Sequence, residues 1–127
     1  MRLLLDTHTF MWWDGDPGQL SAPALSAIRI PANEVWFSVV SAWEMIIKAQ
    51  LNKLTFRIPV ADIIAQQQAN GLRILDVSLA HVLAVEVLPS IHKDPFDRLL
   101  AAQANAEGAE LVTCDPVFAQ YPVRVLW

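Results

Sequence analysis

The sequence predicts an α/β fold, a three-layer α/β/α sandwich built around a mainly parallel sheet of four or five strands. Two patterns carry this prediction. Short apolar segments such as residues 2–5 alternate with longer segments of helical periodicity, which is typical of a parallel sheet covered by helices on both faces. The composition is 54% apolar and 17% charged, as expected for strands buried on both sides. We therefore expect residues 1–127 to form a single domain of this kind.

Each element follows from local signals in the chain. Strands are expected at residues 2–5, 35–39, 72–75 and 110–114, with an edge strand at 123–126. The clearest helix starts where Pro95 follows Asp94 and ends at Gly108, because proline suits the first helical position and glycine the C-terminus. The other helices are expected at residues 7–13, after the N-cap Ser21, and at residues 41–51, 60–70 and 78–88.

Four acidic residues, Asp6, Glu44, Asp97 and Asp115, stand where a predicted strand ends or a predicted helix begins. In an open α/β sheet such positions lie along the carboxyl edge of the strands, where ligands bind. Carboxylates gathered there repel one another at neutral pH unless a positive charge holds them together. Oxygen ligands without a Cys or His cluster favour a hard cation, Mg²⁺ or Mn²⁺, over zinc.

Each acid also has a purely structural interpretation, and the sequence leaves both interpretations open. Asp6 precedes a helix, while Asp94 and Asp115 each precede a proline, so all three suit an N-cap. Residues 41–44 match a capping box, in which the glutamate side chain reaches back to the serine amide. Asp97 suits the positive end of the helix dipole. A joint site is favoured because independent caps need not share one edge of the sheet.

Four segments of the chain carry a resemblance to a known family. They are Leu4-Leu5-Asp6-Thr7-His8, Ser41-Ala42-Trp43-Glu44 with Lys48, His92-Lys93-Asp94-Pro95-Phe96-Asp97-Arg98-Leu99-Leu100-Ala101-Ala102-Gln103-Ala104, and Leu111-Val112-Thr113-Cys114-Asp115. In this order they resemble PIN-domain proteins of the VapC type, the toxin ribonucleases of type II toxin–antitoxin modules. The resemblance covers nearly the whole chain, and the block that begins at His92 is its most specific part.

The resemblance implies a PIN-like fold and an endoribonuclease that cleaves RNA phosphodiesters with water activated by Mg²⁺ or Mn²⁺. It implies that four acids hold the metal, with Asp6 and Asp97 as the direct ligands. The full set is Asp6, Glu44, Asp97 and Asp115. Asp94 is an additional acid for which a helix cap is a sufficient explanation. Thr7 and Thr113 are expected to orient carboxylates through their hydroxyl groups.

The resemblance also implies partners. They are the RNA substrate, a cognate VapB-type antitoxin that blocks the active-site groove, and a second copy of the chain in a homodimer. Three cations that flank the acids are candidate RNA contacts: Lys48, Lys93 and Arg98. For Lys48 a helix salt bridge with Glu44 is an equally good explanation. The histidines lack metal-ligand spacing. For His92 a phosphate contact and a position in a surface loop are both open, and the surface loop is favoured.

The tryptophans have two interpretations. Trp12, Trp13, Trp36 and Trp43 offer either an aromatic surface for a protein partner or ordinary core positions. Trp12 and Trp13 are adjacent on one predicted helix and cannot both face inward, so we expect one of them to be exposed.

Bulk properties restrict the function further. No apolar run approaches the roughly 20 residues of a membrane span, and the apolar start of the chain is too short for a signal peptide. The single cysteine, Cys114, fits a reducing cytoplasm and is expected to be a small buried hydrophobe rather than a reactive thiol. The net charge of −4 disfavours RNA binding unless the excess is concentrated in one metal-binding pocket.

Two phosphate-handling classes and a non-catalytic binding module are the alternative functions. A phosphate-monoester hydrolase of the haloacid-dehalogenase type needs a second aspartate two positions after Asp6, where His8 stands. A receiver domain needs an acidic pair at the first strand end and a phosphoacceptor at the third, where only Asp76 is available. The main alternative is a catalytically silent PIN-like module that binds RNA or protein. Such a module typically lacks an acid, and none is missing here.

Overall fold

A five-stranded, entirely parallel sheet forms the centre of the computed structural model, which describes residues 1–127. The strand order is β3-β2-β1-β4-β5, so β1 is central and β5 lies at one edge. The strands are β1 (Arg2–Leu5), β2 (Glu34–Ser38), β3 (Arg73–Leu75), β4 (Glu110–Val112) and β5 (Val125–Leu126). The mainly parallel sheet and the edge strand near the C-terminus are therefore confirmed.

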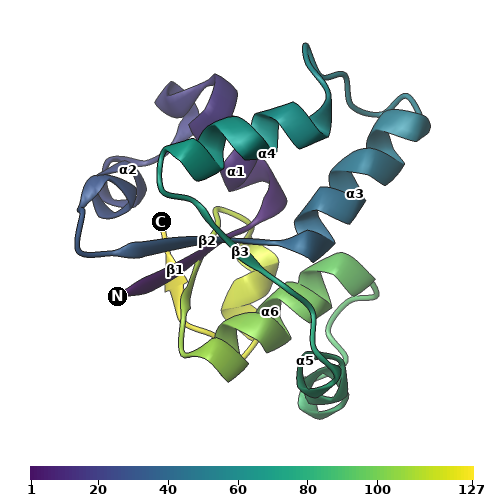
Figure 1. Cartoon of the computed structure of the whole chain (residues 1–127). Helices are drawn as coiled ribbons and strands as arrows, with labels where there is room; N and C mark the ends of the chain where they lie inside the picture. The colour runs from purple at the N-terminus through teal and green to yellow at the C-terminus, as the bar shows by residue number, and fades with distance from the viewer.

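Six α-helices surround the sheet. Figure 1 shows α1, α2 and α4 over one face and α5 and α6 over the other, while α3 extends beyond the end of β2. Their bounds are α1 (Thr7–Gly15), α2 (Ala22–Arg29), α3 (Val39–Gln50), α4 (Val60–Ala69), α5 (Leu79–Ala84) and α6 (Pro95–Glu107). Short 3-10 helices lie at Pro17–Gln19, Val85–Val87 and Pro116–Gln120. The expected three-layer sandwich is confirmed.

The central strand β1 explains the two layers of helices. Leu3 and Leu5 belong to the core beneath α1, α2 and α4, whereas Leu4 belongs to the core beneath α6. All three side chains are 0% exposed, because alternate residues of a strand point to opposite faces. Full burial of a leucine contributes about 1.5–3 kcal/mol, so this short segment anchors both cores and fixes the strand end that carries Asp6.

Two helix boundaries differ from expectation. Helix α3 begins at Val39, because the Ser38 hydroxyl accepts the amide hydrogen of Val40 and caps the helix. Ser41 therefore lies inside α3, and the predicted capping box with Glu44 is wrong. The helix expected to reach residue 88 ends as an α-helix at Ala84 and continues as a 3-10 turn.

Two burial predictions are also wrong. Strand β4 ends at Val112, so Cys114 lies beyond it and is exposed rather than buried. Trp12 and Trp13 are both half-buried, so neither is the exposed tryptophan. That residue is Trp43 on α3, which is 59% exposed.

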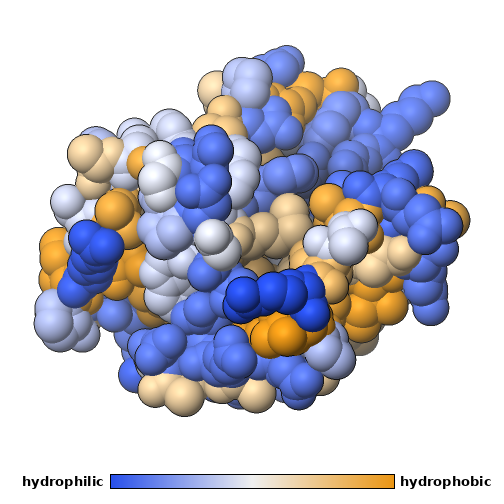
Figure 2. Space-filling view, turned by 90° about the horizontal axis from the view of Figure 1, so that it is seen from above, coloured by the Kyte–Doolittle hydropathy of each residue, from blue (hydrophilic) through white to orange (hydrophobic).

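The surface over α1, α2 and α4 is mostly hydrophilic and carries separate hydrophobic patches rather than one continuous apolar face (Figure 2). Most of the apolar composition goes instead into the two cores on either side of the sheet. No helix has both the length and the apolar character needed to cross a membrane.

Candidate active site at the carboxyl end of the sheet

A pocket of about 460 Å³ opens at the carboxyl ends of β1 and β4. Five carboxylates line it, together with Lys48. The acids are Asp6, Glu44, Asp94, Asp97 and Asp115, and the other five lining residues are Thr7, His8, Trp12, Cys114 and Pro116. The chain thus brings the four predicted acids and Asp94 to one place. The acidic excess of the whole chain is concentrated there, as the net charge had suggested.

Asp6 acts as a helix cap and lines the pocket at the same time. One carboxylate oxygen accepts the amide hydrogen of Thr9 at 2.8 Å, which caps α1. The other accepts a hydrogen bond from the Thr113 hydroxyl at 2.5 Å. Because Thr113 follows β4, this bond ties the two strand ends together. The capping interpretation of Asp6 is correct, and it does not exclude a role in the site.

Glu44 is held from two sides although only 4% of it is exposed. Its Oε1 accepts a hydrogen bond from the Thr7 hydroxyl at 2.6 Å, and its Oε2 pairs with Lys48 Nζ at 2.6 Å. The salt bridge along α3 considered for Lys48 is therefore present. A buried carboxylate needs such partners, since an unpaired buried charge is strongly destabilising.

Asp94 and Asp115 cap helices with one oxygen each. Oδ1 of Asp94 accepts the amide hydrogens of Phe96 and Asp97 at the start of α6. Oδ1 of Asp115 accepts the amide hydrogen of Val117 at 3.0 Å. The second carboxylate oxygen of each acid makes no hydrogen bond within the chain, so both acids have an oxygen available to a ligand in the pocket.

Asp97 is the acid whose ionisation the pocket changes most. Burial raises the pKa of Asp97 to about 7, and the negative charges of Asp94, Glu44 and Asp115 add to that rise. A hydrogen bond with His92 acts in the opposite direction. The pocket therefore holds more negative charge than its own residues neutralise, because Lys48 is already paired with Glu44.

The PIN domain profile matches residues 3–123, nearly the whole chain. The chain belongs to the PIN-domain family. It is also similar to Ribonuclease VapC22 of Mycobacterium tuberculosis, with 34% identity over 114 residues that cover 89% of this chain and 86% of that protein.

Two solved structures have the same fold. One is VapBC2 of Rickettsia felis bound to a promoter DNA fragment, with a TM-score of 0.73 and 18% identity over 98% of this chain and 97% of that one. The other is DNA-bound VapBC of Salmonella typhimurium, with a TM-score of 0.65 and 17% identity over 98% and 96%. At such identities the likeness shows the fold alone, and it confirms the PIN-like α/β sandwich.

Lys93 and Arg98, two of the three predicted RNA contacts, lie outside the acidic pocket. Lys93 is exposed and lines, with Arg98, a separate and largely apolar hollow of about 600 Å³. The Arg98 guanidinium donates hydrogen bonds to the carbonyl of Pro89 at 2.8 Å and to the Tyr121 hydroxyl at 3.3 Å. Of the three cations, only Lys48 lines the acidic pocket.

Two residues that contact the site were missed. His92 Nε2 lies 3.2 Å from Asp97 Oδ2, and His92 Nδ1 lies 2.5 Å from the Tyr121 hydroxyl. The position of His92 five residues before Asp97 is a weak signal in the sequence. Nothing in the sequence points to Tyr121, because its approach depends on how the 3-10 helix Pro116–Gln120 packs against α6.

Cys114 lines the pocket of the PIN domain without the properties of a nucleophile. Although Cys114 is mostly exposed, partial desolvation of its thiol, followed by the negative charge of Asp6, raises the pKa of that thiol. Reactive cysteines need the opposite surroundings, which favour the thiolate. The pocket therefore provides carboxylates rather than a nucleophilic side chain.

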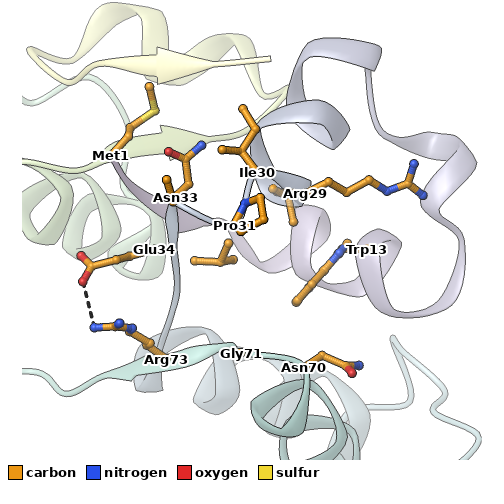
Figure 3. Close-up of a pocket in the computed structure, with 13 residues that line it drawn as sticks. Met1, Trp13, Arg29, Ile30, Pro31, Asn33, Glu34, Asn70, Gly71 and Arg73 are labelled. Carbon is orange, nitrogen blue, oxygen red and sulfur yellow. Dashed lines mark ion pairs between the residues drawn. The ribbon is translucent and has the colours of Figure 1, made fainter.

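A second large hollow, of about 630 Å³, lies at the opposite end of the sheet (Figure 3). Its single carboxylate is neutralised, since Glu34 pairs with Arg73 at 2.8 Å and with Arg2 at 3.1 Å. This amino-end hollow is larger than the acidic pocket but contains no cluster of unpaired charge. We therefore locate the candidate site by charge and not by volume.

The chemistry of the acidic pocket suits a hard cation. Its available ligand atoms are carboxylate and hydroxyl oxygens, which Mg²⁺ and Mn²⁺ prefer. No three carboxyl, imidazole or thiol groups are placed so that they could together hold a metal ion. Mg²⁺ does not require three such groups, because it keeps several of its waters and binds through one or two carboxylates.

Proposed function

We propose that this PIN-domain chain is a Mg²⁺- or Mn²⁺-dependent endoribonuclease and the toxin of a type II toxin–antitoxin module. The observation that carries the proposal is the pocket in which five carboxylates face a single lysine. Such a charge imbalance is stable only with a proton or a cation, and Asp97 already has its pKa raised to about 7. The relative named Ribonuclease VapC22 supports RNA as the substrate.

We assign Asp6 and Asp97 as direct metal ligands and Glu44 and Asp115 as the acids that complete the site. Asp6 and Glu44 are held by threonine hydroxyls, and Asp97 is held by His92. Hydrogen bonds of this kind fix the carboxylate orientation that a bound cation requires. In our proposal Asp94 caps α6 and contributes only its charge.

The residues of the chain hold the carboxylates in position and contact the phosphate, and the cation would supply the remaining chemistry. When bound, a divalent cation activates water for attack on the phosphodiester and neutralises the charge that develops on the phosphate. Thr7 and Thr113 keep Glu44 and Asp6 in fixed rotamers, so little reorganisation is needed during the reaction. Lys48, at the rim with 31% of its side chain exposed, is the remaining candidate for a phosphate contact.

Partners follow from the same assignment. We propose that residues 1–127 form one nuclease domain that is inhibited by a cognate VapB-type antitoxin. We also propose that the chain forms a homodimer and is located in the cytoplasm. The solved relatives named VapBC support an antitoxin partner. Trp43, which packs edge-on against Phe96 and is 59% exposed, is the tryptophan most accessible to a protein partner.

The test is cleavage of a mixed pool of single-stranded and structured RNA with Mg²⁺, with Mn²⁺ and with EDTA. Asp97→Asn is prepared identically, and Asp62→Asn serves as its matched control because Asp62 is exposed on the first turn of α4. We expect metal-dependent cleavage by the wild type and by Asp62→Asn, and none by Asp97→Asn.

Three other results have clear meanings. Cleavage that survives both EDTA and Asp97→Asn would come from a contaminating nuclease, whereas metal-dependent cleavage that survives Asp97→Asn would contradict the assignment of Asp97. If no RNA in the pool is cut while metal still raises the melting temperature, the alternative of a catalytically silent PIN-like binding module is favoured.

A further inference from the structure

A chain of three side chains ends on Asp97. Arg98 Nη1 donates a hydrogen bond to the Tyr121 hydroxyl at 3.3 Å, and that hydroxyl lies 2.5 Å from His92 Nδ1. The other ring nitrogen, Nε2, lies 3.2 Å from Asp97 Oδ2. Tyr121 is only 4% exposed, so water has little access to this part of the chain and the protein groups must satisfy one another.

The donors and acceptors of these groups leave one consistent arrangement. The Tyr121 oxygen already accepts a hydrogen from Arg98, so its own hydrogen is free to be donated. The acceptor within reach is His92 Nδ1. A neutral imidazole that accepts at Nδ1 carries its hydrogen on Nε2, where Asp97 Oδ2 accepts it.

Other protonation states of His92 satisfy fewer groups. The Nδ1–H tautomer would direct an Nε2 lone pair at the ionised Asp97 carboxylate and leave the Tyr121 hydrogen without an acceptor. A doubly protonated ring would satisfy Asp97 but would again deprive the Tyr121 hydrogen of its partner. Arg98 also stays in place independently, because it donates to the carbonyl of Pro89 at 2.8 Å.

We propose that His92 is a positioning residue, held as the neutral Nε2–H tautomer by Tyr121 and Arg98, that aims the Asp97 carboxylate into the acidic pocket. Arg98 thereby serves the site from behind rather than by touching RNA. The tautomer follows from the hydrogen bonds alone. The consequence for a cation rests on the proposed function, in which Asp97 is a metal ligand.

The first test is the tautomer of each histidine, measured by long-range ¹H–¹⁵N NMR at pH 8, where Asp97 is ionised. We expect His92 to be an Nε2–H tautomer. His81 is an internal reference for the same state, because its Nδ1 accepts the amide hydrogen of Ser78 at 3.0 Å. His8 is exposed and makes no hydrogen bond within the chain, so it is the reference for a ring whose tautomer no such bond selects.

Tyr121→Phe removes the donor to Nδ1 and should shift the His92 spectrum toward that of His8, with the spectrum of His81 unchanged. An Nδ1–H tautomer in the wild type, or a His92 spectrum that does not respond to Tyr121→Phe, would overturn the proposal.

The second test compares Mn²⁺ binding by His92→Gln and His92→Phe, measured by electron paramagnetic resonance titration. The glutamine amide can still donate to Asp97, whereas phenylalanine cannot, so a merely structural role would not separate the two variants by their binding. We expect His92→Phe to bind Mn²⁺ about 10–100-fold more weakly than the wild type, and His92→Gln to recover most of the loss.

Equal affinities for the two variants would overturn the positioning role. If the wild type itself binds no Mn²⁺, the proposed function fails, while the NMR tautomer still decides whether the chain from Arg98 to Asp97 exists.

Discussion

The two ends of the parallel sheet carry acids in opposite electrostatic conditions. At the amino end, Glu34 pairs with Arg2 and Arg73. Burial is the largest single influence on the pKa of Glu34 and raises it, but the hydrogen bonds and charges of these two cations together outweigh it and leave the pKa lowered. At the carboxyl end, burial and neighbouring acids raise the pKa of Asp97 to about 7. The same fold thus pairs one carboxylate, that of Glu34, with two cations, and places five carboxylates around a single cation, Lys48.

The carboxyl end of the sheet gives up stability in exchange for the capacity to bind a cation. A paired acid such as Glu34 needs nothing further from solution. The cluster at the carboxyl end is stable only with a proton or an added cation, and perturbed pKa values of this kind gather at functional sites. Substitutions at the carboxyl end should therefore change cleavage or the metal requirement, whereas the matched substitution at the amino end should not.

The largest effect is expected from Glu44→Gln. Glutamine can still accept the Thr7 hydrogen bond but removes a negative charge from the pocket, so cleavage should fall roughly 10²–10⁴-fold while the protein stays folded. Steady-state cleavage and circular dichroism measure the two quantities. The matched change at the other end, Glu34→Gln, should leave the cleavage rate unchanged. Retained activity in Glu44→Gln would remove that residue from the site.

A smaller loss is expected from Thr113→Val, which keeps the side-chain shape but removes the hydroxyl that donates to Asp6 at 2.5 Å. Loss of an outer hydrogen bond to a metal ligand typically reduces metal affinity or activity about 10–100-fold. The concentration of Mn²⁺ that gives half-maximal cleavage should rise accordingly. Thr55→Val, at an exposed position outside the acidic pocket, is the control. A metal requirement that Thr113→Val does not change would contradict this role.

The pH dependence of stability should differ between the metal-free and metal-bound protein. Because the pKa of Asp97 is raised from 3.8 to about 7, the folded state holds a proton that the unfolded state has released between these pH values. The free energy of unfolding should therefore fall as pH rises through this window in EDTA.

Thermal melts from pH 4 to pH 8 measure that effect. Asp97→Asn should show a shallower decrease and a higher melting temperature at pH 8, since it removes the group that responds to pH. An equally steep decrease in the variant would mean that another group dominates.

The smallest effect is expected from Asp94→Ser. Serine can replace aspartate as the N-cap of α6, so stability and cleavage should both stay close to wild type, apart from a lower pKa of Asp97. A rate comparison at saturating Mn²⁺ measures this directly. An inactive Asp94→Ser would promote Asp94 to the metal ligands.

The gathering of the acids was predictable because it depends on local order along the chain. Strand ends and helix starts can be recognised from apolar segments, prolines and caps, and a parallel sheet then brings Asp6 and Asp115 to the same edge. The capping box failed because Ser38 competes with Ser41 for the same helix start, and the pattern alone cannot choose between them.

What could not be predicted depends on packing between distant segments. Tyr121 reaches His92 across 29 positions in the sequence, and no local pattern links the two residues. Trp43 was one of four tryptophans with the same two interpretations, and only the tertiary structure selects it as the exposed one. The contacts from Tyr121 through His92 to Asp97 therefore required the folded chain, whereas the acids and the expectation that Thr7 and Thr113 orient carboxylates did not.

The most direct test of the account is the change in melting temperature caused by Mn²⁺ at pH 8. A ligand that binds only the folded state stabilises it in proportion to the logarithm of its concentration above Kd. We predict that Mn²⁺ raises the melting temperature of the wild type and of Asp62→Asn, and has little effect on Asp97→Asn. Equal increases in all three proteins, or none in any, would contradict the claim that the acids at the carboxyl end form a cation site.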